Sequence, residues 1–200
     1  PAEPRNFDFR TRARIPNDRL RPLEAQYTRV ARSLEAWLSG RIRGSVEVTL
    51  QGVEQISFGE FVSSLATPCC SYIYEIHDSG GQSAVIDFGQ EFAFCLVERL
   101  FGGVGPLELP NRPLTPIERM AVRSVADRVA SLVRESWHGH VEIDMGLTGW
   151  ESIPESVQVA AREDPVLVSV FQVGASEVRS HLSVCLPFGV LETFFADGGG

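Results

Sequence analysis

The feature that most constrains this sequence is an internal repeat with a period of about 100 residues. Residues 29–34 (Arg-Val-Ala-Arg-Ser-Leu) are echoed by residues 128–132 (Arg-Val-Ala-Ser-Leu), and a tryptophan, Trp37 or Trp137, follows in each half. A repeat of this length is too long for a solenoid. It predicts two copies of one α/β unit that pack together as a pseudo-dimer.

The two halves show the same order of hydrophobic patterns: helix, strand, short helix, β-hairpin and helix. The elements expected in the first half cover residues 17–39, 46–57, 58–65, 70–77 with 83–86, and a helix that ends at Gly102. Those expected in the second half cover residues 115–137, 141–147, 157–161, 166–173 with 178–186, and 188–195. The predicted fold class is α+β, layered α/β/α, with a pseudo-two-fold repeat of an α-β-α-β-β-α unit around one mostly antiparallel sheet.

Two helix starts carry capping signals. Thr115 is followed by Pro116 and Glu118, which predicts a capping box with proline in the first turn. Asp87 with Gln90 three residues later predicts a second box.

Because a pseudo-two-fold domain would expose equivalent helices on opposite edges, the long helices 20–39 and 115–137 are candidates for lateral contacts between subunits.

The expected domain organisation is a single folded unit with short flanking segments. Residues 1–16 are expected to form an extended lead-in, and residues 17–195 one domain of two repeats, 17–105 and 114–195, joined by the linker 106–113. Residues 196–200 are glycine-rich and are expected to be a linker or an added tail, and both ends are expected to be cuts through a longer chain.

A glycine-rich stretch, residues 100–106 (Leu-Phe-Gly-Gly-Val-Gly-Pro), separates the two repeats. Gly102 is well placed to end the preceding helix in the left-handed conformation. The further glycines are expected to leave backbone groups bare for a partner or to let the chain turn sharply. The alternative from spacing alone is a helix cap followed by a flexible loop.

Charge and hydropathy exclude several functional classes. A net charge of −8 argues against a nucleic-acid-binding surface. No apolar run reaches the roughly 20 residues that span a bilayer, and no secretory signal is visible, so no membrane insertion is expected.

Few residues indicate catalysis or metal binding. The glycine-rich stretch lacks the lysine and hydroxyl of a phosphate-binding loop. His138 and His140 have no third ligand nearby, and His77 and His181 lie in or beside hairpin strands, so no metal and no cofactor is expected. The cysteines lack zinc-like spacing and are expected to be small buried hydrophobic residues in a reducing cytoplasm; they are Cys69, Cys70, Cys95 and Cys185.

From about Phe7 to Phe195, the order and spacing of short motifs resemble those of the bacterial flagellar motor switch family FliM, in its middle domain. The motifs are Asn6-Phe7-Asp8-Phe9-Arg10, Val46-Glu47-Val48, Val53-Glu54-Gln55 with Phe61, Val97-Glu98-Arg99-Leu100-Phe101-Gly102-Gly103, Leu114-Thr115-Pro116-Ile117-Glu118 and Val184-Cys185-Leu186-Pro187.

This resemblance implies a pseudo-symmetric fold shared with CheC-type chemotaxis phosphatases and a non-enzymatic role in the cytoplasmic ring of the rotor, at the inner membrane. It implies that the domain associates with neighbouring FliM subunits and docks the FliG middle domain through a GGxG loop, which here is Gly102, Gly103, Val104 and Gly105. The family's segment that binds phosphorylated CheY and its FliN-like domain, the link to FliN, are expected to lie outside this sequence. The implied mechanism is a CheY signal that shifts this domain and reorients FliG, which sets the direction of rotation.

Two alternatives share part of this pattern. A CheC-type CheY-phosphate phosphatase carries a Ser/Asp-x-x-x-Glu-x-x-Asn signature, whose acid and amide are missing here. The nearest frames read Ser124, Arg128, Ser131 in the second half and Arg21, Ala25, Thr28 in the first. A scaffold of the type III secretion sorting platform is the other alternative, and it would not need the glycine-rich stretch as a FliG dock.

Overall fold

The computed structural model describes residues 15, 17–42, 44–103, 109–175 and 177–196. The predicted lead-in and tail, and residues 106–108 of the predicted linker, therefore lie almost entirely outside the described residues. In chain order the elements are α1 (Asn17–Ser39), β1 (Val46–Ser57), α2 (Phe58–Ser64), β2 (Ser71–Ile76), β3 (Ser83–Phe88), α3 (Gln90–Leu100), α4 (Pro116–Trp137), β4 (Met145–Glu151), the 3₁₀ turn η1 (Pro154–Ser156), β5 (Pro165–Ala175), β6 (Val178–Pro187) and α5 (Phe188–Ala196).

The strands form one six-stranded sheet in the order β1-β5-β6-β3-β2-β4, and each neighbouring pair is antiparallel. The order is symmetric about the central pair β3 and β6, since each strand of the first repeat mirrors its counterpart in the second. Val85 pairs directly with Cys185, and these two residues are one repeat apart in the sequence. The expected α+β fold with a pseudo-two-fold repeat is confirmed.

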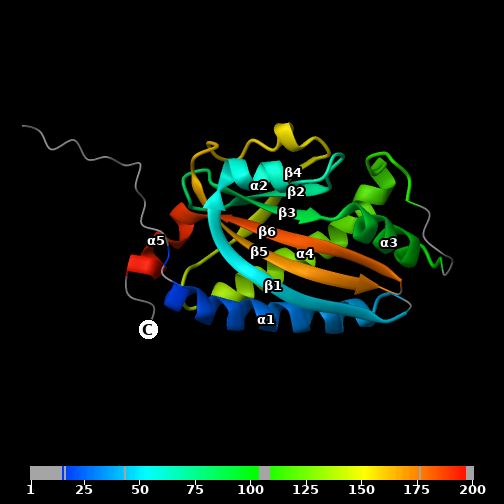
Figure 1. Ribbon diagram of the computed structural model, residues 1–200, viewed down its shortest axis with the longest axis horizontal. Helices are drawn as coiled ribbons and strands as arrows, with labels where there is room; N and C mark the ends of the chain where they lie inside the picture. The colour runs from blue at the N-terminus through cyan, green and yellow to red at the C-terminus, as the bar shows by residue number, and fades with distance from the viewer. Residues whose placement is uncertain (1–14, 16, 43, 104–108, 176, 197–200) are drawn as a thin grey trace, which may run out of the picture.

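Side chains on the two faces of the sheet enter two separate cores, as the two-residue period of a strand requires. On β5, Leu167 and Phe171 join the larger core beneath α1 and α4, whereas Val166 and Val168 join a smaller core beneath α2 and η1. The structure thus has three layers, with the long helices on one face of the sheet and the short elements on the other (Figure 1).

The long helices α1 and α4 pack against each other rather than on opposite edges. Trp137 Nε1 donates a hydrogen bond to the hydroxyl oxygen of Tyr27 at 3.0 Å, and both side chains are fully buried. Gln26 Nε2 donates to Ser136 Oγ at 3.2 Å. The expectation that these helices lie on opposite edges is wrong, because both bury their apolar stripes on one face of the sheet.

Three further local expectations are wrong. Asp87 does not cap α3: it is buried in β3, where Ser71 Oγ donates to its Oδ1 at 2.7 Å, and Gly89 takes the cap position without a side-chain hydrogen bond. The short helix expected over 157–161 is replaced by η1, which begins at Pro154. The strand expected over 141–147 begins only at Met145.

Candidate partner-binding site

The glycine-rich stretch follows α3, which is held rigidly by its buried face. Phe92, Ala93 and Leu96 are fully buried in the larger core, where α3 packs against β6 and α4. The end of α3 therefore presents a fixed surface at the right-hand end of the molecule in Figure 1.

The helix ends in a Schellman motif built on Gly102. Gly102 has φ +88°, the left-handed conformation that glycine adopts without a Cβ penalty. Its N–H donates to the carbonyl of Arg99 at 3.1 Å, and the N–H of Gly103 donates to the carbonyl of Glu98 at 2.8 Å, which is the paired bonding of this cap. The predicted role of Gly102 as the helix terminator is confirmed.

Gly103 serves a different purpose. A Cβ at this position would overlap the carboxylate of Glu98, which folds back over the loop. The Gly103 carbonyl accepts a hydrogen bond from Arg99 Nη1 at 3.1 Å. The N–H groups of Gly102 and Gly103 and this carbonyl are thus used within the chain, contrary to the expectation of a bare backbone. Val104 and Gly105 lie outside the described residues.

Large apolar side chains are exposed at the end of α3 and on the first turns of α4. Phe101, between α3 and Gly102, is 60% exposed although it is an aromatic residue. Ile117 and Met120, on the first turns of α4, are also largely exposed. Exposed large apolar side chains on neighbouring elements are a common feature of protein–protein contact surfaces.

Arg112 ties the start of α4 to α3. Its guanidinium lies 5.3 Å from the centroid of the Phe94 ring and forms a bidentate pair with Glu118, at 2.7 and 2.9 Å. Glu118 also accepts a hydrogen bond from the N–H of Thr115 at 2.7 Å, in the predicted capping box, which is confirmed. The hydrogen bonds from Arg112, together with those from Thr115, lower the pKa of Glu118 to about 2. These contacts fix the exposed residues of both helices relative to each other.

The other clusters singled out in the sequence do not form a catalytic centre. His138 lies 3.3 Å from Glu142, whereas His140 packs on the ring of Phe194, so the two histidines do not converge. Among the described residues, no group of three or more His, Cys, Asp or Glu side chains could hold a metal ion. The four cysteines are free and buried, as expected, and burial raises the pKa of Cys70 to about 12.

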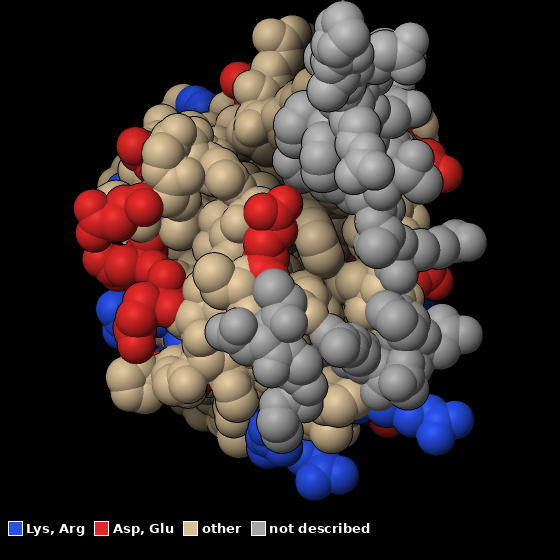
Figure 2. All heavy atoms as spheres, turned by 90° about the vertical axis from the view of Figure 1, so that its left-hand side faces the viewer, with Lys and Arg blue, Asp and Glu red and all other residues tan. Residues whose placement is uncertain are grey.

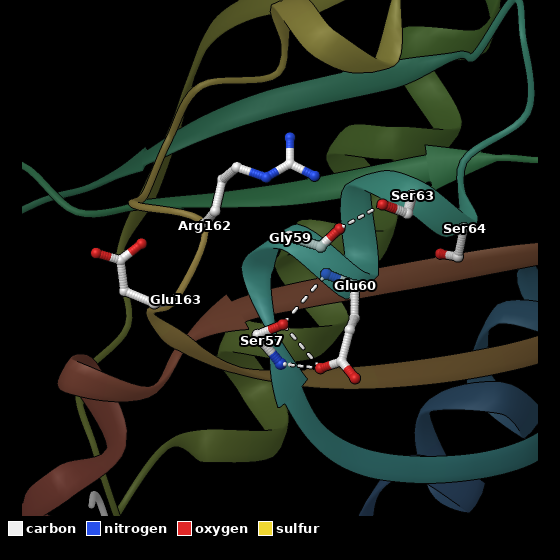
Figure 3. A pocket seen from close by; sticks show the side chains of 7 residues that line it. All are labelled: Ser57, Gly59, Glu60, Ser63, Ser64, Arg162 and Glu163. Atoms are coloured by element: carbon white, nitrogen blue, oxygen red, sulfur yellow. Dashed lines mark hydrogen bonds between the residues drawn. The ribbon is translucent and has the colours of Figure 1, made fainter. Parts of the chain in front are cut away.

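An open hollow beside α2 is shaped by structural contacts (Figure 3). Ser57 and Glu60 form a capping box at the start of α2, and Gly59 N–H donates to the carbonyl of Arg162 at 2.8 Å. A Cβ on Gly59 would lie 3.0 Å from that carbonyl oxygen, so the glycine permits this close approach. The hollow lies between α2 and the loop before β5. The residues that line it do not form an arrangement of catalytic groups.

Figure 2 shows the end of the molecule opposite α3. Carboxylate side chains gather there along one side (Figure 2). In the described part of the chain, no helix is long and apolar enough to cross a membrane.

On α4, the residues at the positions of the phosphatase signature form contacts within the helix instead. Arg128 pairs with Glu135 at 3.3 Å, and Ser124 Oγ donates to the carbonyl of Ala121 at 2.8 Å. Arg128 places a cation where the phosphatase signature requires an acid.

Sequence reasoning missed Glu98, Phe101 and Arg112 as residues of this surface. The exposure of Phe101 could be expected from the sequence, because a large apolar residue directly before a glycine cap has few neighbouring residues that could bury it. Glu98 and Arg112 could be identified only from side-chain geometry.

Comparison with known proteins yields one consistent family. The profile of the family "Flagellar motor switch protein FliM" matches residues 16–197. The flagellar motor switch protein FliM of Treponema pallidum is 27% identical over 186 residues, which cover 93% of this chain and 54% of that protein. The chain spans about half the length of the curated relatives it matches.

Solved structures agree with this match. The FliG–FliM complex from H. pylori contains a chain that is 26% identical, with a TM-score of 0.84 over 91% of this chain and all of that one. The FliM–SpeE complex from H. pylori matches at 25% identity and a TM-score of 0.82, over 93% of this chain and 97% of that one. With the symmetric sheet and the glycine-capped α3, these matches show that the chain belongs to the FliM family of flagellar motor switch proteins.

Proposed function

We propose that this chain is a FliG-binding part of the flagellar rotor and that the end of α3 is its docking surface. The surface consists of Glu98, Phe101, Gly102 and Gly103 and the exposed residues Ile117 and Met120 of α4; it is called the α3-end surface below. Val104 and Gly105, which the sequence also assigns to the dock, remain a prediction.

The observation that carries this proposal is Phe101, which is 60% exposed and whose backbone is held by the helix cap. An exposed aromatic side chain on an ordered backbone is a typical anchor of a protein interface, because only its few side-chain rotamers must be ordered on binding. The likeness to the FliM chain of a FliG–FliM complex supports FliG as the partner.

The wider role follows from the family. The domain associates laterally with neighbouring FliM subunits at the cytoplasmic side of the inner membrane. It relays the signal of phosphorylated CheY to FliG and thereby sets the direction of rotation. FliN and CheY are contacted mainly by parts of FliM other than this domain. The role is mechanical, and the ion pair of Arg128 with Glu135 in place of a catalytic acid supports a non-enzymatic function over the phosphatase alternative.

The test is a calorimetric titration of the chain with the FliG of the same organism. Phe101→Asp places a charge in the centre of the α3-end surface and is expected to weaken binding at least tenfold, about 1.4 kcal/mol. Ile153→Asp is the matched control, since Ile153 is also exposed but lies next to η1 on the other face of the sheet.

Binding of the unchanged chain that survives Ile153→Asp and is lost with Phe101→Asp supports the proposal, provided that circular dichroism shows both variants folded. Absence of binding by the unchanged chain, or equal binding by the two variants, contradicts it. In that case hydrolysis of CheY-phosphate is the next activity to assay.

A further inference from the structure

The carboxylate of Glu98 occupies an unusual position on the α3-end surface. It folds back over Gly103, into the volume that a Cβ would need, so it rests directly on the loop backbone. Any other residue at position 103 would displace it. The glycine therefore determines where this charge stands.

Glu98 forms no ion pair with a described side chain. The cations nearest in sequence make other contacts: Arg99 donates to the carbonyl of Gly103, and Arg112 is paired with Glu118. Among the described residues, neither an ion pair nor a hydrogen bond involves the Glu98 carboxylate. It is half-buried and stands within three residues of the exposed Phe101.

From this geometry we infer that Glu98 is the charged contact of the α3-end surface and receives an arginine or lysine side chain of FliG. A half-buried carboxylate that forms no ion pair with a described side chain can accept a charge-assisted hydrogen bond from a partner's cation, which excludes the remaining water. Phe101 supplies the apolar anchor. Glu98 sets the position of FliG on the surface, because FliG must then present a basic group next to its binding site for the Phe101 ring. This inference rests on the proposed binding of FliG.

The first test compares Glu98→Gln with Glu155→Gln in the same calorimetric titration. Glutamine keeps the shape of the side chain and removes the charge, so Glu98→Gln is expected to weaken binding about tenfold. It should also flatten the dependence of the dissociation constant on salt concentration, because one ion pair is lost. Glu155 is exposed on η1, and its substitution is expected to change neither quantity.

The second test is a double-mutant cycle between positions 98 and 103. Gly103→Ala displaces the Glu98 carboxylate and should weaken binding as much as Glu98→Ala does. The two changes together should cost no more than either alone, because both remove one interaction. Unfolding midpoints of the four proteins show whether any variant is destabilised.

The outcomes separate this inference from the proposed function. If Phe101→Asp abolishes binding but Glu98→Gln leaves affinity and salt dependence unchanged, the charged contact is refuted and the dock is retained. Additive effects of Glu98→Ala and Gly103→Ala also refute it. If the unchanged chain does not bind FliG, the proposed function itself fails.

Discussion

At the scale of single residues, two adjacent glycines at the end of α3 serve different physical needs. Gly102 is required by its backbone, since φ +88° is strained for any residue with a Cβ, and the space around it is open. Gly103 leaves room for its neighbour, because the Glu98 carboxylate lies where a side chain at position 103 would stand. The first need concerns stability and the second the shape of the surface.

Gly102→Ala should therefore lower the free energy of unfolding by about 1–2 kcal/mol through backbone strain alone. Gly52→Ala is the control, because this strand glycine also has open space around it but no positive φ. Urea unfolding of both variants measures the difference. Equal stabilities would show that the left-handed conformation does not carry this cost.

His181 is predicted to make stability depend on pH. Its Nε2 lies 3.8 Å from Oδ2 of the buried Asp87, and Asp87 raises the pKa of His181, with a smaller contribution from Glu91. A pKa raised in the folded state stabilises the protein fully below the ordinary histidine value of 6.5, and this stabilisation is lost as pH rises through the folded value. Urea unfolding across neutral pH should show this loss in the unchanged chain and not in His181→Gln. The same dependence of the free energy of unfolding on pH in both proteins would contradict this role of His181.

At the scale of elements, caps and cross-links decide where the helices begin and how they are joined. Arg112 contacts Phe94 of α3 and Glu118 of α4, so a single side chain fixes the two elements that build the α3-end surface.

Glu118→Gln tests this cross-link, because glutamine preserves the capping box and removes the ion pair with Arg112. The pKa of Glu118 is lowered to about 2 in the folded protein, chiefly by Arg112. Its contribution to stability is thus present above the unfolded value and is lost as pH falls toward 2. Thermal unfolding should show the variant less stable at neutral pH, with a difference that shrinks in acid. A difference that is constant with pH would assign the loss to packing instead.

At the scale of the whole molecule, the two repeats share one sheet and one pair of packed helices. Trp137 and Trp37 occupy matching repeat positions, but only Trp137 is fully buried, where it donates to Tyr27 across the α1–α4 contact. Trp37 is half-buried beneath Arg41, whose guanidinium lies 4.2 Å from the ring centroid. The equivalent tryptophans thus lie in the core in the second repeat and closer to the surface in the first.

Tyr27→Phe should lower the free energy of unfolding by about 1–3 kcal/mol, since it leaves the Trp137 N–H buried without an acceptor. Burial raises the pKa of Tyr27 to about 12, which agrees with a hydroxyl in a fully desolvated site. Trp37→Phe is the control and should cost less, because no buried partner is left unsatisfied. The reverse order of the two effects would contradict the assigned role of the α1–α4 contact.

Features that depend on local sequence were predictable, and features that depend on contacts across the sheet were not. The Gly102 cap, the Thr115 box and the two hairpins follow from residue types at short spacing. The Asp87 pattern does not predict a cap correctly, because a partner 16 residues away, Ser71, holds that carboxylate inside β3. The position of Glu98 over Gly103 depends on side-chain packing, which no spacing rule encodes.

The most direct test of the α3-end surface as the FliG dock is hydrogen–deuterium exchange of the chain with and without saturating FliG. Docking of FliG on the α3-end surface predicts slower exchange of the amides at the end of α3 and in the first turns of α4, with no change in α2 and η1. Protection confined to α2 and η1, or to the edge strand β4, would contradict the assignment of the dock.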